Sequence, residues 1–297
     1  MSDIEPPSGI GWTALLTAYC RSVESERPDR IFNDPLGAVF ASEATETSMP
    51  DAERPRLGPA NGDHTTGMWH FYCTYIAMRT PFYDQRLTHA VASGCRQVVL
   101  LAAGLDSRAY RLDLPDDTTV FELDQDAVLD YKQLVLDREQ AQASCRRVPI
   151  AVDLREEWTG PLLAAGFDPK KATVWIVEGL LMYLSDSDCS QLLSTVSSLS
   201  APGSRLVTEY YSRQPRVEDM RSGSKDEQEQ ASWALAMEQF DTGPTSSPAT
   251  WLADHRWELT GLTHVAAETH RWNRPLPTEL DQSDIILWLL EGEFKTT

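Results

Sequence analysis

The chain has few basic residues: 26 Lys and Arg stand against 45 Asp and Glu in 297 residues, a formal net charge of −19. Nucleic acids and anionic membranes are bound through clustered Lys and Arg, so this balance argues against either as the main partner. No segment approaches the roughly 18 to 20 consecutive apolar residues of a membrane-spanning helix. The first residues also lack the basic and then apolar pattern of a secretory signal. We therefore expect a soluble, cytoplasmic protein.

Cysteine and histidine are also scarce and poorly placed for metal binding. The five cysteines are widely spaced without a Cys-x-x-Cys pair, and their odd number argues against a disulfide framework. The six histidines include two pairs six residues apart, His64 with His70 and His264 with His270, a spacing that suits neither one helical face nor a zinc signature. We predict no metal site.

Short apolar segments rich in β-branched residues alternate with helical segments after residue 94. This alternation predicts βαβ crossovers and a doubly wound, mostly parallel sheet, which has seven strands if the last two expected segments are counted. Thr263–His270 and Ile285–Phe294 are expected to form a closing pair of strands, although the second segment also fits a helix. The five strands expected before them lie in residues 97–102, 119–124, 147–154, 172–184 and 204–211.

The first 90 residues have a helical and irregular pattern. Apolar residues at spacings of three and four from Trp12 to Val23 predict an amphipathic helix. We expect residues 1–90 to form a helical cap within the same domain as a core over 91–297, which carries an insertion at 212–248. Ser42–Asp63 and Ser212–Pro248 are long, polar and proline-containing, so we expect at least one of them to be a lid over the substrate.

Carboxylates follow three of the expected strands. Asp124, Asp153 and Glu178 stand at corresponding strand ends, and an open α/β sheet binds its ligand at that edge. Asp124 follows Gly104 by 20 residues, the distance at which a nucleotide-binding βαβ unit places an acid on the ribose hydroxyls. Neither a Gly-x-Gly-x-x-Gly motif nor a phosphate-binding loop is present, which argues against a diphosphate. S-adenosylmethionine, which has a ribose diol and a cationic tail, fits this pattern.

Six motifs follow one another along the chain: RPDRIFNDPLG (27–37), MRTPFYDQRL (78–87), VVLLAAGLDSRAYRL (98–112), FELDQ (121–125), AVDL (151–154) and VEGLLMYL (177–184). This ordered set resembles the leucine carboxyl methyltransferase family, and within it the bacterial branch of polyketide carboxyl O-methyltransferases. The resemblance covers roughly residues 10–210 and implies a Rossmann-like sheet of the class I methyltransferase type. The chain has Ala102-Ala103-Gly104 where the family usually has Gly-Ala-Gly or Gly-Cys-Gly.

The resemblance implies roles for individual residues. Arg79 is expected to pair with the carboxylate of the methionine moiety, which Gly104 and its neighbour Ala103 would line. Asp124, next to Gln125, would hold the ribose, as its spacing also indicates. Asp153 and Leu154 would frame the adenine. Glu178, next to Gly179, would lie beside the cofactor's amino group.

The implied reaction is O-methylation of a carboxylate on a small molecule of polyketide type, with S-adenosylhomocysteine as the second product. A carboxylate is already ionised at neutral pH and needs no general base. The residues we consider for orienting the acceptor, from their positions on strand ends and flanking loops and for Tyr183 from the resemblance, are Tyr183, Tyr19, Tyr210, Tyr211, Arg213 and His64.

Other functions stay open at this point. A phenolic hydroxyl would be an acceptor that calls for a base such as His64 or His70, and a protein C-terminal carboxylate is a further acceptor. A nicotinamide-dependent oxidoreductase would explain the pair Gly104 and Asp124 but lacks the pyrophosphate glycines. A protein that binds S-adenosylmethionine without catalysis also fits the pattern.

Overall fold

A computed structural model describes residues 5–47, 54–65, 67–215, 226–281 and 284–295. Its described strands form one seven-stranded sheet in the order β3-β2-β1-β4-β5-β7-β6. The strands are β1 (Gln97–Leu101), β2 (Thr119–Asp124), β3 (Arg146–Ala151), β4 (Thr173–Val177), β5 (Arg205–Tyr211), β6 (Trp257–His264) and β7 (Leu287–Phe294). The first five pair in parallel, and β7 runs antiparallel to both β5 and β6.

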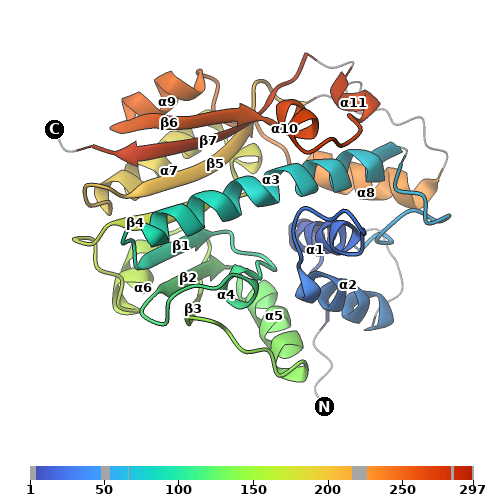
Figure 1. The fold of residues 1–297 in the computed structure, drawn as a ribbon, viewed down its shortest axis with the longest axis horizontal. Coiled ribbons are helices and arrows are strands. Elements are labelled where there is room, and N and C mark those ends of the chain that lie inside the picture. Colours follow the sequence, from blue (N-terminus) through green and yellow to red (C-terminus); the bar gives the residue numbers. More distant parts are fainter. Residues whose placement is uncertain (1–4, 48–53, 66, 216–225, 282–283, 296–297) are drawn as a thin grey trace.

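Helices cover both faces of the sheet (Figure 1). The described helical elements before β4 are η1 (Gly9–Gly11), α1 (Trp12–Ser25), α2 (Pro35–Thr47), α3 (Gly67–Ala92), α4 (Arg108–Arg111), α5 (Asp126–Arg138) and α6 (Thr159–Ala164). Those after it are η2 (Leu181–Tyr183), α7 (Asp186–Ser198), α8 (Glu227–Glu238), α9 (Pro248–Asp254), α10 (Val265–Arg271) and α11 (Thr278–Asp281). The predicted doubly wound fold is confirmed.

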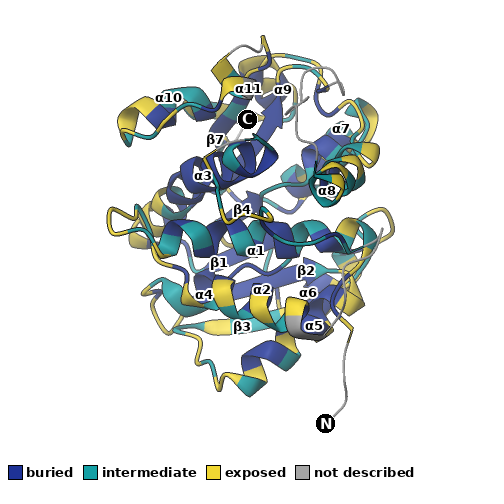
Figure 2. Cartoon of the chain, turned by 90° about the vertical axis from the view of Figure 1, so that its right-hand side faces the viewer, coloured by how far each residue is buried: buried dark blue, intermediate teal, exposed yellow. Residues whose placement is uncertain are grey.

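The alternating side chains of β1 divide the core into two layers. Val98 and Leu100 pack in a cluster with residues of α1, α3 and α5. Val99 and Leu101 point to the other face and pack with residues of α6, α7 and α9. Because successive side chains of a strand face opposite ways, a fully apolar strand is what a sheet covered on both faces requires. Figure 2 shows the central strands buried and the edge strand β3 largely exposed.

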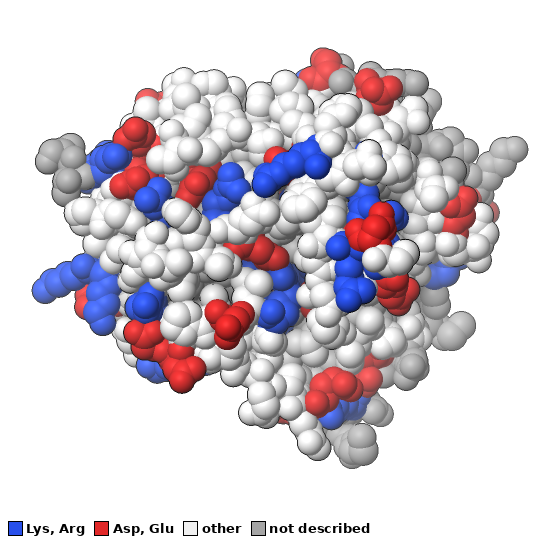
Figure 3. Space-filling model, viewed as in Figure 1, with Lys and Arg blue, Asp and Glu red and all other residues white. Residues whose placement is uncertain are grey.

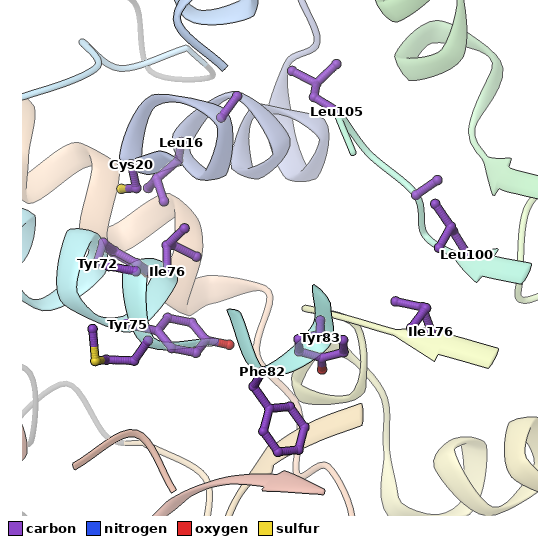
Figure 4. Close-up of a cluster of buried hydrophobic side chains, with 14 of the residues drawn as sticks. Leu16, Cys20, Tyr72, Tyr75, Ile76, Phe82, Tyr83, Leu100, Leu105 and Ile176 are labelled. Atoms are coloured by element: carbon purple, nitrogen blue, oxygen red, sulfur yellow. The ribbon is translucent and has the colours of Figure 1, made fainter. Parts of the chain in front are cut away.

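The long helix α3 ties the N-terminal segment to the sheet. It crosses one face of the sheet in Figure 1 and packs against α1 on its other side. In Figure 4, Leu16 and Cys20 of α1 lie near Tyr72 and Ile76 of α3, in the same apolar cluster as β1. We therefore infer that residues 1–90 share one domain with the core.

Two expectations about local structure were wrong. Residues 42–47 continue helix α2 instead of starting a loop, because the buried Phe40, Ala41 and Ala44 anchor that helix and Glu43 pairs with Arg138 of α5. The strand that pairs with β7 is β6, and α10 begins directly after it; the side chain of His264 caps this helix by accepting from the Ala267 amide at 3.2 Å. The two predicted lids include residues 48–53 and 216–225, which lie outside the described residues.

Surface charge agrees with the composition. The face drawn in Figure 3 carries acidic and basic side chains interspersed, with no extended basic patch. No helix within the described ranges is long and apolar enough to cross a membrane.

The turn after β1 holds an alanine in a backbone conformation that favours glycine. Ala102 has φ of 56° and Gly104 has φ of 50°. A Cβ in the left-handed region costs roughly 1 kcal/mol, so the glycine usual in the resembling family at position 102 has a conformational reason.

We expect Ala102→Gly to leave the free energy of unfolding unchanged within about 0.5 kcal/mol, because relief of strain offsets the entropy of the added glycine. Ala103→Gly, at the adjacent position without positive φ, should lower it by about 1 kcal/mol. Urea denaturation measures both values. Equal losses in the two variants would show that Ala102 is not strained.

Candidate active site

A cavity of about 350 Å³ lies beyond the carboxyl ends of β1, β2 and β4. Its volume is in the range of small-molecule sites. β1 and β4 are neighbours although two strands separate them in sequence, so the cavity lies where the strand order reverses. All the residues predicted for the cofactor line it: Arg79, Ala103, Gly104, Asp124, Gln125, Asp153, Leu154, Glu178 and Gly179.

Asp124 is held by the backbone on both of its oxygens. One carboxylate oxygen accepts from the Gly104 amide at 2.6 Å and the other from the Gln125 amide at 2.7 Å. Burial raises the pKa of this carboxyl. Each oxygen keeps a further lone pair, so the side chain can still accept hydrogen bonds from a vicinal diol in the cavity.

Asp153 lies at the more exposed rim of the cavity. Hydrogen bonds from Arg155 lower the pKa of its carboxyl. Val128 and Val152 add apolar surface nearby in the lining. The combination of an acceptor at the edge and apolar walls fits a purine base with an exocyclic amine.

Arg79 is buried between two carboxylates. Its Nε lies 3.0 Å from Glu178 Oε1, and its Nη1 lies 2.6 Å from Glu209 Oε1. Glu209 Oε1 also accepts from the Tyr75 hydroxyl at 2.5 Å and from the Gly179 amide at 3.0 Å. Nη2 of Arg79 has no hydrogen-bond partner in the described part of the chain, so it is the nitrogen available to an anion in the cavity.

A second arginine completes this network of charges. Arg108 Nη1 donates to Glu178 Oε2 at 2.7 Å, and its Nε donates to Asp84 at 2.8 Å. Arg108 also pairs with Asp106. Burial by itself would raise the pKa of Asp106, but the Arg108 guanidinium brings it down to about 2. Glu178 therefore lines the cavity with each of its oxygens next to an arginine.

The comparisons with known proteins agree with this geometry. The family profile described as leucine carboxyl methyltransferase matches residues 14–197. The chain belongs to the leucine carboxyl methyltransferase family. A candidate S-adenosyl-L-methionine-dependent methyltransferase of Parafrankia is 39% identical over 92% of this chain and 84% of its own length. Another, of Streptomyces avermitilis, is 39% identical over 92% of this chain and 91% of its own length.

Similarity to solved structures supports the fold. A crystal structure of a candidate methyltransferase from Thermobifida fusca covers 95% of this chain and 94% of its own with a TM-score of 0.54 and 16% identity. As a member of this family, the chain is an S-adenosylmethionine-dependent methyltransferase with a class I fold. The cavity fits that cofactor, since it joins the carboxylate of Asp124, a glycine turn and an available guanidinium nitrogen.

The residues predicted to orient the acceptor divide into two groups. Tyr183 and Tyr211 line the cavity. Tyr19 and His64 are not part of the lining: the Tyr19 hydroxyl lies 2.5 Å from Nε2 of His64.

Tyr210 and Arg213 also lie outside the lining. The Tyr210 hydroxyl donates to the Ser246 carbonyl at 2.9 Å, on the opposite face of the sheet from Tyr211. Arg213 pairs with Asp284. The structure does not bring these two side chains to the cavity.

Several residues of the site escaped the sequence analysis. Glu209 is a buried acid inside a strand, Tyr72 and Tyr75 belong to an apolar helix stripe, and Phe240 follows α8. The acid in the middle of the strand segment 204–211 was the one available signal, since a buried acid needs a partner.

We expect Asp124→Ala to weaken binding of S-adenosylhomocysteine by about 1 to 3 kcal/mol, because charge-assisted hydrogen bonds to the ribose are lost. Asp116→Ala, at an exposed position, is the control and should bind normally. Isothermal titration of both folded variants gives the values. Unchanged affinity for Asp124→Ala would remove this residue from the ribose site.

Arg79→Lys should weaken S-adenosylmethionine more than methylthioadenosine, which lacks the amino-acid tail. The lysine keeps the charge between Glu178 and Glu209 but offers no second nitrogen in the place of Nη2. Titration with both ligands tests the difference. Equal losses would mean that Arg79 acts only through the packing of the cavity.

Proposed function

We propose that the protein transfers a methyl group from S-adenosylmethionine to a carboxylate of a small molecule and so forms a methyl ester. The observation that carries this proposal is the chemistry of the cavity wall. Among the described residues that line it there is no histidine, lysine or cysteine. Its carboxylates are engaged by backbone amides or arginines. A site without an uncommitted base suits an acceptor that is already ionised.

The cofactor supplies a methyl carbon bonded to a positively charged sulfur. In the transfer, an oxygen–carbon bond forms to the acceptor while the carbon–sulfur bond breaks, and its electron pair stays on sulfur as a neutral thioether. No proton moves when the acceptor is a carboxylate. The residues of this chain then need only to bind, to align and to exclude water.

Arg79, Asp124 and Gly104 would hold the cofactor, while Tyr183 and Tyr211 face the remaining volume. Phe240 stands against both tyrosine rings, with centroids 5.2 Å from that of Tyr183 and 5.8 Å from that of Tyr211. This aromatic wall suits a polyketide-like acid, the class that the family resemblance implies.

The cavity suits a phenolic acceptor less well than a carboxylate. It requires a base near the transferred methyl group, and His64, the histidine considered for this task, lies against Tyr19 outside the lining. Burial also lowers the pKa of His64.

We expect kcat/KM for a carboxylate acceptor to be flat between about pH 6 and pH 9. A carboxyl with a pKa near 4 is ionised throughout this range. Burial raises the pKa of Tyr183 to about 12, so its hydroxyl stays protonated as well. The measurement is methyl-ester formation by mass spectrometry, with 2-naphthoate as acceptor and 2-naphthol as the matched phenol. Preferred transfer to the phenol, with a rate that rises with pH, would overturn the proposal.

A further inference from the structure

Three tyrosines from three different elements meet at the part of the cavity away from Asp124. Tyr72 comes from α3, Tyr183 from η2 and Tyr211 from β5. Tyr183 and Tyr211 flank the ring of Phe240. All three line the cavity and belong to or pack against one apolar cluster. Burial raises the pKa of Tyr72, and the neighbouring Tyr183 and Tyr211 raise it further.

Two of these hydroxyls have no hydrogen-bond partner within the described residues. Tyr72 is 7% exposed and Tyr211 is 5% exposed. The ring of Tyr72 contacts the rings of Phe71 and Trp233, and the ring of Tyr211 contacts that of Phe240. Neither oxygen is among the fully buried atoms without a partner, so each reaches the open volume of the cavity. A hydroxyl that opens into the cavity and has no partner in the described protein is available to hydrogen-bond a ligand there.

The neighbouring tyrosines show the ordinary arrangement. Tyr75 donates to Glu209 at 2.5 Å, and Tyr210 donates to the Ser246 carbonyl at 2.9 Å. Tyr183 interacts with the Thr13 side chain. Tyr72 and Tyr211 therefore differ from these neighbouring tyrosines, because their hydroxyls make no hydrogen bond within the described protein.

The arginines of the described lining do not offer an equivalent donor on this side. Arg21 pairs with Asp34 at 2.6 Å and donates to the Leu105 carbonyl at 2.6 Å. Arg155 is bound to Asp153. Arg79 keeps one nitrogen, which our proposal assigns to the methionine carboxylate.

We propose that Tyr72 and Tyr211, together with Tyr183, donate hydrogen bonds to the reacting carboxylate of the acceptor, so that neutral phenols take the place of a cation. This inference rests on the proposed function. Neutral donors hold the carboxylate without forming an ion pair that would quench its charge. The oxygen therefore remains a nucleophile while the donors fix its direction toward the methyl group.

The test uses the full-length protein loaded with S-adenosylhomocysteine and titrated with 2-naphthoate. Tyr72→Phe and Tyr211→Phe should each raise the Kd for 2-naphthoate about tenfold or more, because each removes a hydrogen bond to a charged group. Affinity for S-adenosylhomocysteine should stay the same. The Tm of these variants should be equal to that of the wild type, since neither substitution removes a hydrogen bond within the described protein.

Tyr210→Phe is the matched control. It loses a hydroxyl that has a protein partner, so it should lower the Tm and leave 2-naphthoate binding unchanged. The opposite patterns of Tyr210→Phe and Tyr211→Phe distinguish ligand binding from a structural role, because the two residues are adjacent in the same strand.

Steady-state methylation completes the test. We expect a raised KM for 2-naphthoate in Tyr72→Phe and Tyr211→Phe, with a smaller change in kcat. Unchanged Kd and KM in both variants, with ester still formed, would overturn this inference and leave the proposed function standing. Transfer by the wild type to 2-naphthol but not to 2-naphthoate would instead overturn the proposed function, and the inference with it.

Discussion

The ion pairs of Arg79 are the constraint on which the site depends. Two carboxylates, Glu178 after β4 and Glu209 within β5, hold this buried guanidinium in place from α3. Burying three charges is expensive unless each is paired, so the helix and the two strands are fixed relative to one another by the cost of separating them. The Gly179 amide adds a hydrogen bond to Glu209 and fixes the turn after β4 as well.

The same constraint extends around the cavity through shared carboxylates. Glu178 is also bound by Arg108, which links the turn after β1 to the turn after β4. Arg21 of α1 donates to the Leu105 carbonyl and pairs with Asp34, so the N-terminal helix is attached to that turn. These charges serve mainly as structural links, and the arginines of the described lining leave one guanidinium nitrogen, Nη2 of Arg79, for a ligand. A pre-organised site of this kind suits a displacement that needs alignment more than proton transfer.

Much of the fold could be predicted because its signals are local. The apolar run Val98–Leu101 predicts a strand covered on both faces, and the structure buries every residue of β1. The alternation of strands and helices then restricts the topology to a right-handed doubly wound sheet. The predictions of local structure were wrong where the residue pattern of a segment and its packing in the fold point to different structures. Residues 42–47 are polar, yet they continue a helix whose preceding residues are buried.

The sequence by itself determined the parallel sheet, the row of acids at its strand ends and the family, since these depend on strand order and on motifs within single segments. Only the tertiary structure decided what those residues contact. It placed Glu209 against Arg79 across 130 residues of chain, and it brought together Tyr72, Tyr183 and Tyr211 from three elements. It also separated Tyr210 from Tyr211, because adjacent side chains of a strand face opposite sides of the sheet. Contacts between distant segments depend on how helices dock on the sheet, and no spacing along the chain records that.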